Sequence, residues 1–364
     1  MSWRSNIAVV LCLTATLQCE RAAGAEQPPN VLLIMTDNHG AWTLGCYGNP
    51  DIRTPHIDRL AAEGVLFTRA FASNGVCSPT RATYLTGLVP SQHGVHCFLR
   101  ANEAQIGPDA YCTIAEFRTL PKVLAENGYR CGLVGKWHLG GNLSPQEGFQ
   151  DWVTTPHGAT STFYDAEVIE DGRVRREPTY LTDFWTEHAV RFLRENRGGG
   201  GGNADRPFFL FLSYNGPYAL GRLLLRPSRN PHAEHYADKW LPSFPRAEMH
   251  PWLFNNREYL NNIESIRRVA AEVSGVDDGV GTVLDTLREL DLDRDTLVVF
   301  CADQGWLGGQ NGLWGMGDHT RPLTAFDGMM RVPLIVRHTG RIPAGTKSDI
   351  MVSNYDLMPT VLSY

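Results

Sequence analysis

The stretch 29-PNVLLIMTDN-38 decides the fold class of this chain. It places an apolar run from Val31 to Met35 directly before three polar residues, Thr36, Asp37 and Asn38. A continuous apolar run, as opposed to an alternating one, is typical of a strand buried on both faces of a parallel sheet. Four further runs of this kind occur at residues 129–135, 207–214, 296–302 and 332–336. We therefore expect a parallel central sheet.

Helical patterns separate these runs. Residues 118–128 carry Leu120, Val123 and Leu124 on one face, and Gly128 stands where a helix C-cap belongs. Residues 265–290 carry a long stripe of valine and leucine at helical spacing. Alternating strands and helices predict an α/β three-layer sandwich with a mostly parallel central sheet. The glycine run 198–203 indicates a flexible loop, and the aperiodic segment 220–262 favours a lid or a substrate-recognition insertion.

The composition describes a globular, exported protein. The chain has 364 residues, of which 43% are hydrophobic and 20% charged, and its formal net charge of −6 argues against nucleic-acid binding. Residues 1–25 resemble a signal peptide: Arg4 supplies the charge, residues 7–17 the apolar core and residues 23–25 a small-residue cleavage site. The apolar core is too short for a membrane span. We expect a periplasmic or secreted location, with residues 26–364 forming the mature domain.

The cysteines leave the disulfide pattern open. Two of the eight fall in the predicted signal peptide, so six remain in the mature domain. An even number in an oxidising compartment permits disulfides without requiring them. Cys97 and Cys112 are the pair to test first for a bridge. Cys131 and Cys301 lie in apolar runs, which favours buried thiols.

Polar side chains follow three of the predicted strands. Asp37 and Asn38 end the first, Lys136 and His138 follow the second, and 303-DQ-304 ends the fourth. The carboxyl ends of parallel strands meet at one edge of a sheet, where ligands bind. Carboxylate and amide oxygens suit a hard divalent cation, Ca²⁺ or Mg²⁺. The alternative interpretation is a set of turn-forming residues beside a solvated lysine.

Four ordered motifs carry a family resemblance. They are 29-PNVLLIMTDN-38, 77-CSPTRATYLTG-87, 128-GYRCGLVGKWHLG-140 and 301-CADQGWLGGQNGLWG-315. With them the chain resembles the type I sulfatases of the alkaline-phosphatase-like superfamily, from about residue 28 to its end. A lone Cys-x-Pro-x-Arg run would be weak evidence, whereas four motifs in order are specific. The resemblance implies an alkaline-phosphatase-like fold.

The resemblance also implies a mechanism. In this family a formylglycine-generating enzyme oxidises the motif cysteine, here Cys77, to an aldehyde. One hydroxyl of the hydrated aldehyde attacks sulfur, the ester oxygen leaves, and the second hydroxyl allows the sulfated intermediate to collapse. Carried over by position, Arg81 holds the diol, Lys136 stabilises charge on the sulfate or diol, and His138 acts as acid or base. The metal ligands carried over are Asp37, Asn38, Asp303, Gln304 and the modified Cys77.

The chain departs from the family at four positions. Asn38 replaces a usual aspartate, which should weaken cation binding, and Gln304 replaces a shorter Asn or a His. Tyr218 replaces a usual histidine and Met316 a usual lysine, both on the side of the leaving group. These two changes indicate an altered leaving-group strategy or weak activity. His319 is a candidate to replace the missing histidine and lysine. Equally, it could be a histidine in a loop with no catalytic role.

The sequence therefore predicts a sulfuric ester hydrolase that acts on a sulfated small molecule or glycan. One alternative is a phosphoester or phosphonate hydrolase of the same superfamily. Another is a catalytically weakened carbohydrate-binding relative, which the residues at positions 218 and 316 favour and the intact 77-CSPTR-81 opposes. Residues 351–364 resemble the start of a helix, whereas family members usually continue into a smaller C-terminal subdomain. We therefore expect the sequence to be truncated there.

Overall fold

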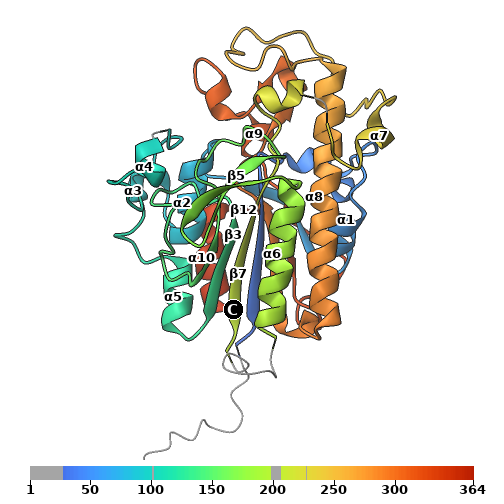
Figure 1. Ribbon diagram of the computed structural model, residues 1–364. Coiled ribbons are helices and arrows are strands. Elements are labelled where there is room, and N and C mark those ends of the chain that lie inside the picture. Colours follow the sequence, from blue (N-terminus) through green and yellow to red (C-terminus); the bar gives the residue numbers. More distant parts are fainter. Residues whose placement is uncertain (1–27, 101, 198–205, 227) are drawn as a thin grey trace, which may run out of the picture.

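An eight-stranded sheet runs through the computed structural model, which describes residues 28–100, 102–197, 206–226 and 228–364 (Figure 1). The strand order is β12-β2-β11-β8-β1-β7-β3-β4. The predicted signal peptide and the glycine run 198–203 lie outside the described residues. The strands of this sheet are β1 (Asn30–Asp37), β2 (Val65–Phe71), β3 (Arg130–Gly135), β4 (Asp151–Val153), β7 (Phe208–Pro217), β8 (Thr296–Ala302), β11 (Leu334–Arg337) and β12 (Thr346–Ser353).

The predicted parallel pairing is confirmed for most of the sheet. Strand β1 lies at its centre and pairs in parallel with β7 and β8, and β3 pairs in parallel with β7 and β4. The expectation for residues 332–336 was wrong, because β11 runs antiparallel to both β8 and β2. The Met330 carbonyl accepts a hydrogen bond from the Ala72 N–H, just past the end of β2. The chain therefore enters β11 from the carboxyl edge, a direction that an apolar run does not encode.

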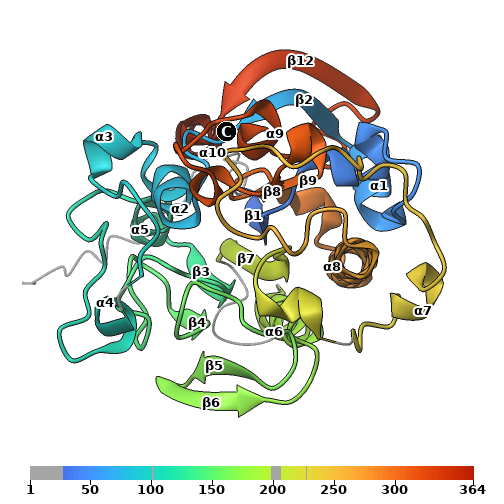
Figure 2. The ribbon, with the colours of Figure 1, turned by 90° about the horizontal axis from the view of Figure 1, so that it is seen from above.

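Helices cover both faces of the sheet, which confirms the three layers (Figure 2). On β1, Leu32 and Ile34 pack in the cluster that holds α1, α6 and α8, while Val31, Leu33 and Met35 pack with α2, α5 and α10. Burying one such side chain contributes about 1.5–3 kcal/mol. The helices are α1 (Pro55–Ala62), α2 (Cys77–Thr86), α3 (Pro90–His93), α4 (Asn102–Ile106), α5 (Leu120–Glu126), α6 (Leu181–Glu195), α7 (Ala233–Tyr236), α8 (Ile263–Glu289), α9 (Asp327–Met330) and α10 (Leu357–Ser363).

The helix boundaries follow local chemistry. At the start of α8 the Asn262 side chain accepts hydrogen bonds from the backbone N–H groups of Glu264 and Ser265, which are otherwise unpaired at a helix start. Beyond α5, Gly128 has φ of 90°, a conformation that favours glycine, as the sequence predicted. Helix α2 likewise ends at Gly87, which adopts the left-handed conformation with φ of 67°. That residue closes the motif that begins at Cys77.

Outside the main layers the chain is less regular. Strands β5 (Ala166–Glu170) and β6 (Arg173–Glu177) form a hairpin, and β9 (Leu307–Gly308) pairs with β10 (Trp314–Gly315). The aperiodic segment 220–262 contains the short helix α7 and one 3₁₀ turn, Arg222–Leu225, and it lies beside α8 (Figure 1). Its role as a lid stays a prediction. Among the described residues, none of the helices has the length and apolar character needed to cross a membrane.

The cysteines outside the predicted signal peptide are all free thiols in the structure. The suggested Cys97–Cys112 bridge was therefore wrong: Cys97 is exposed in a loop, and Cys112 is half-buried. Cys131 and Cys301 are buried in strands β3 and β8, as their apolar surroundings predicted.

Candidate active site

The carboxyl edge of the sheet brings two aspartates together. Strands β1 and β8 pair in parallel with Thr36 opposite Ala302, so the next residues, Asp37 and Asp303, end neighbouring strands. The Asn38 backbone N–H donates to Asp303 Oδ1 at 3.0 Å, and Asn38 itself has φ of 56°. Both carboxylates are fully buried. Burial and the neighbouring Asp303 raise the pKa of Asp37 to about 7, against the opposing effect of two nearby cations.

Lys136 is one of those cations. It follows β3, and its backbone N–H donates to the Ser213 carbonyl on β7 at 2.8 Å. Gly135 makes this approach possible, because a Cβ at that position would lie 1.9 Å from the Ser213 oxygen. The Lys136 ammonium reaches across β7 and binds Asp37 Oδ2 at 2.6 Å, with neither side chain exposed. The lysine is therefore paired and fixed inside the site, which excludes the alternative of a solvated lysine.

Cys77 is the first residue of α2 and faces the two aspartates. Its thiol donates to Asp37 Oδ1 at 3.5 Å and accepts a hydrogen bond from Gln304 Nε2 at 3.3 Å. The side chain is fully buried. Burial raises the pKa of the Cys77 thiol well above its usual value, although Lys136 acts in the opposite direction. The unmodified residue is thus a neutral thiol at physiological pH.

Arg81 lies one helical turn after Cys77 and therefore on the same face of α2. Its Nε and Nη2 donate to Asp303 Oδ2 at 3.1 and 2.9 Å. Its Nη1 donates to the Lys136 carbonyl at 2.8 Å and to Ser213 Oγ at 2.7 Å. A buried guanidinium with these partners is rigidly oriented. Arg81 and Lys136 match the charges of Asp303 and Asp37, so these four residues carry no net formal charge.

The donor set fits a hard divalent cation. Asp37, Cys77 and Asp303 each place a possible ligand atom within 4.8 Å of the others. The Gln304 amide nitrogen donates to Asn38 Oδ1, while the buried Asn38 Nδ2 has no hydrogen-bond partner. A half-turn of the Gln304 amide exchanges its nitrogen and oxygen, which would place an oxygen ligand beside Cys77 Sγ. Carboxylate and amide oxygens are the ligands that Ca²⁺ and Mg²⁺ prefer.

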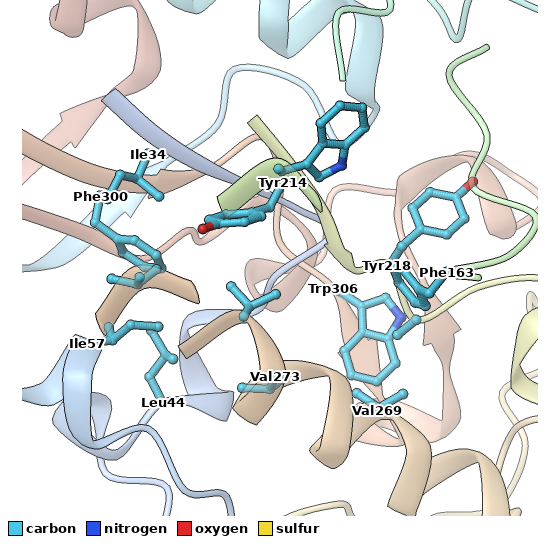
Figure 3. Close-up of a cluster of buried hydrophobic side chains, with 14 of the residues drawn as sticks. Ile34, Leu44, Ile57, Phe163, Tyr214, Tyr218, Val269, Val273, Phe300 and Trp306 are labelled. Carbon is cyan, nitrogen blue, oxygen red and sulfur yellow. The ribbon is translucent and has the colours of Figure 1, made fainter. Parts of the chain in front are cut away.

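Tyr218 and Met316 both reach this polar cluster. The Tyr218 backbone N–H donates to the Asp37 carbonyl at 3.1 Å, and the Tyr218 ring centre lies 5.4 Å from the Lys136 ammonium. Met316 Sδ lies 3.5 Å from Gln304 Nε2. Both side chains are almost completely buried and belong to a hydrophobic cluster that also holds Phe163. Figure 3 shows Tyr218 and Phe163 among the members of this cluster. Tyr218 and Met316, two of the four departures from the family pattern, therefore enclose the polar cluster with apolar surface.

His138 lies close to the site, although no hydrogen bond joins its imidazole to Cys77. Its Nε2 is 3.1 Å from the Leu99 carbonyl, its ring centre is 4.4 Å from that of Phe98, and Gly158 packs against the ring. Burial lowers the pKa of His138 well below its usual value, so the ring is neutral and Nε2–H donates to Leu99. Its buried Nδ1 has no hydrogen-bond partner among the described residues and carries the lone pair of the neutral ring.

His319 has a local structural contact. Its Nδ1 accepts the Met316 backbone N–H at 3.2 Å and lies 3.4 Å from an Asp318 carboxylate oxygen. This bond leaves Nε2 as the protonated nitrogen of the neutral ring. Burial lowers the pKa of His319. The turn thus fixes the ring of His319 next to Met316, and no hydrogen bond between this ring and Cys77, Lys136 or Tyr218 is formed.

Two residues of the site were not identified from the sequence. Ser213 orients Arg81, and Thr80 places its hydroxyl 2.8 Å from the Cys77 carbonyl and 3.3 Å from Gln304 Oε1. Ser213 sits in the apolar run 207–214, where a polar residue near the strand end was an available signal. Thr80 lies inside the 77-CSPTR-81 motif, but its spacing alone does not reveal its contact with residue 304.

These features define a class of protein. A mostly parallel sheet covered by helices on both faces, with paired carboxylates at its carboxyl edge, is the fold of the alkaline-phosphatase-like superfamily. The family model described as Sulfatase matches residues 29–364. The chain belongs to the sulfatase family.

Known relatives agree with this assignment. The chain is 32% identical to N-acetylgalactosamine-6-sulfatase of Canis lupus familiaris, over 94% of this chain and 63% of the relative. It thus spans less than two thirds of that relative's length. A solved protein in complex with its substrate D-glucosamine-2-N,6-O-disulfate is 25% identical, with a TM-score of 0.68 over 93% of this chain and 76% of that one. A solved protein from Bacteroides fragilis is 24% identical, with a TM-score of 0.74 over 94% of this chain and 75% of that one, which supports the fold.

Proposed function

We propose that this chain is an exported sulfuric ester hydrolase whose nucleophile is formylglycine made from Cys77. The observation that carries the proposal is the surroundings of Cys77: it begins α2 and faces the buried ion pairs Lys136–Asp37 and Arg81–Asp303. A structural cysteine requires no such cluster. The chain's membership of the sulfatase family and the sulfatase names of its relatives support the same reaction.

Each polar side chain has a proposed task. Hydrated formylglycine at position 77 would supply the oxygen that attacks sulfur. Arg81, held by Asp303 and Ser213, would orient that hydrate, and Lys136 would stabilise negative charge on the sulfate. The free Nδ1 of His138 would take the proton that must leave the hydrate when the aldehyde re-forms.

The proposed metal site consists of Asp37, Asn38, Asp303, Gln304 and the modified residue 77, with Ca²⁺ as the cation or Mg²⁺ in its place. When bound, the cation would polarise the sulfate oxygens and lower the pKa of the hydrate. Asn38 supplies no charge to this site, so binding should be weaker than with a third carboxylate. The proposed substrate class is a sulfated glycan or small molecule, as the names of the relatives suggest. Maturation would need a formylglycine-generating enzyme as partner.

The proposal predicts that co-expression with a formylglycine-generating enzyme makes the chain active on aryl sulfates. Peptide 70–81 should then react with an aldehyde probe in mass spectrometry, and 4-nitrophenyl sulfate should be hydrolysed faster than 4-nitrophenyl phosphate. Protein made without the enzyme is the control and should lack both properties. A preference for phosphate would instead establish the phosphoester hydrolase alternative. A fully converted protein that turns over neither ester would establish the binding-protein alternative, which the apolar enclosure by Tyr218 and Met316 favours.

A second prediction concerns the leaving group. Burial raises the pKa of the Tyr218 hydroxyl well above its usual value, and Met316 carries no ionisable group. A positioned general acid typically contributes about 10²–10⁴-fold, and phenols need it less than sugar alcohols do. We expect aryl sulfates to be hydrolysed much faster than sugar sulfates. If His319 is the acid, His319→Ala should reduce activity on sugar sulfates far more than on aryl sulfates.

The matched variant for this test is Tyr218→Phe, which removes only the hydroxyl and keeps the buried ring. Small and equal effects of His319→Ala on both substrate types would exclude His319 as the acid. A gain in sugar-sulfate activity on Tyr218→His together with Met316→Lys would show that the loss of these two groups limits the reaction. Rates should be measured at equal formylglycine content, so that maturation and catalysis remain separate.

A further inference from the structure

A cavity of about 680 Å³ lies beside the proposed active site. Its walls come from residues 155–165 and the start of β5, from β7, and from Leu223, Arg226, Ser228 and Arg229, with α8 contributing Arg268 and Glu272. This volume falls in the roughly 300–1,000 Å³ range of small-ligand sites.

Tyr218 connects this cavity with the polar cluster around Cys77. Its ring faces the Lys136 ammonium and packs in the same hydrophobic cluster as Phe163, which lines the cavity. Asn215 also lines the cavity, and its amide nitrogen donates to Thr160 Oγ1 at 2.8 Å. The Tyr218 ring therefore lies between the Lys136 ammonium and the wall of the cavity.

Four arginines line the cavity of a chain whose net charge is −6. Arg229 pairs with Asp165 at 3.1 Å, and the Arg268 guanidinium donates to the Leu224 carbonyl. Arg176 and Arg226 are exposed, and their side chains have no ion-pair or hydrogen-bond partner among the described residues. They come from β6 and from the end of the 3₁₀ turn, which are distant in sequence and meet at this wall.

The acidic groups of the cavity do not cancel these two arginines. Asp165 is already paired with Arg229, and Glu272 is buried beneath the wall, where it accepts a hydrogen bond from the Tyr180 hydroxyl. Glu167 is the remaining acid; it is exposed and lies directly opposite Arg176 in the β5–β6 pairing, so it can offset one of the two charges. Two free guanidinium groups against one free carboxylate leave the cavity with an excess of positive charge. Guanidinium groups bind sulfate and carboxylate oxygens through paired hydrogen bonds.

Other groups of the wall suit a sugar. The Tyr164 hydroxyl and His157 Nδ1 are buried atoms that find no hydrogen-bond partner within the part of the chain that the structure describes. The Tyr164 ring stacks on Tyr180, with ring centres 5.2 Å apart, and the Arg229 guanidinium lies 4.1 Å from the centre of the Tyr164 ring. A few unpaired polar groups beside a fixed aromatic ring are typical of a site that orients a small polar ligand.

We propose that this cavity binds the saccharide part of the sulfate ester and that Arg176 and Arg226 bind a second anionic group, a sulfate or a carboxylate, on that saccharide. The proposal rests on the proposed function, which it extends from a sulfate ester to a substrate with two anionic groups. The scissile sulfate would face Lys136, and the second oxyanion would face the two arginines across the sugar.

Binding to protein made without the formylglycine-generating enzyme tests this proposal without turnover. Calorimetry would compare three probes: N-acetylglucosamine 6-sulfate, glucosamine N,6-O-disulfate, and a disaccharide of a uronic acid and N-acetylglucosamine 6-sulfate. We expect at least one of the two dianionic probes to bind about 10-fold or more tightly than the monoanion. The probe with the larger gain identifies the second group as sulfate or carboxylate.

The double variant Arg176→Ala/Arg226→Ala should remove this gain and change monoanion binding by less than about 3-fold. The matched control is Arg173→Ala/Arg222→Ala, which removes the same charge from the same two elements at exposed positions outside the cavity wall. The control should keep the gain. An equal loss in both double variants, no gain in the unmodified chain, or a gain that survives the first variant would overturn the proposal.

The result of this binding test can be distinguished from the result of the turnover test of the proposed function. Arginine-dependent binding without aryl-sulfate turnover by matured protein would refute the hydrolase and keep the dianion site. Turnover of aryl sulfate without arginine-dependent binding would refute the dianion site and keep the hydrolase. Thermal unfolding of both double variants shows whether the fold is intact.

Discussion

Matured protein carrying Cys77→Ala should lose hydrolysis of 4-nitrophenyl sulfate by on the order of 10⁴-fold or more, as expected when a covalent nucleophile is removed. The methyl group of alanine cannot be converted to an aldehyde. The ion pairs of Lys136 with Asp37 and of Arg81 with Asp303 do not involve the thiol, so they should remain. Initial rates and thermal unfolding, measured on the same preparation, separate lost chemistry from lost folding.

Cys301→Ala is the matched control for this substitution. Cys301 is also a fully buried thiol, but it lies within β8 and outside the proposed nucleophile position. Its replacement should cost stability through a small cavity and leave the formylglycine content of position 77 unchanged. Substantial activity of the Cys77→Ala variant, above that of a matched preparation without enzyme, would show that the nucleophile is another group.

The second large effect is expected for Asp303→Ala, which should reduce both metal content and stability. Asp303 accepts hydrogen bonds from Arg81 and from the backbone N–H groups of Asn38 and Gln304. Without this carboxylate the buried guanidinium of Arg81 loses its charge partner, and breaking a buried ion pair in this way costs about 3–5 kcal/mol. The proposed cation would at the same time lose one of its two aspartate ligands.

Elemental analysis and thermal unfolding measure these two effects separately. Asp303→Asn keeps the shape of the side chain and should retain more stability than Asp303→Ala, with the metal still weakened. The control Asp295→Ala removes an exposed carboxylate just before β8 and should change neither quantity. Full calcium or magnesium content in Asp303→Ala would contradict the proposed ligand set, and zinc as the sole metal of active protein would contradict the proposed cation.

Much of the architecture was predictable because short apolar runs and helical periodicity in the sequence indicate it. The five apolar runs all became strands of the sheet, and residues 118–128 and 265–290 became α5 and α8. Strands β2, β4 and β12 were not predicted. Strand β4 has only three residues, and β2 and β12 have mixed burial with exposed residues such as Arg69 and Ile350, so none of the three forms the continuous apolar run that identified the central strands.

Part of the site was predictable for a similar reason. Parallel strands carry the residues that follow them to one edge, so Asp37, Lys136 and Asp303 could be placed together before their contacts were known. The ion pair that joins Lys136 to Asp37 across β7 could not be read from the spacing. Whether the Lys136 ammonium pairs with Asp37 or with Asp303 depends on side-chain direction and on the strand order. Both are properties of the folded sheet.

The sequence by itself determined the α/β class, the strand runs, the motif around Cys77 and the four departures from the family, because each is encoded by residue identity over a few positions. The tertiary structure decided the antiparallel direction of β11, the enclosure of the polar cluster by Tyr218 and Met316, and the meeting of Arg176 with Arg226 at one cavity. The physical reason is that burial, charge pairing and cavity shape arise from segments distant in the chain. A local sequence pattern indicates on which side of its own helix or strand a residue lies. Only the packing of helices and strands determines which other residues that side contacts.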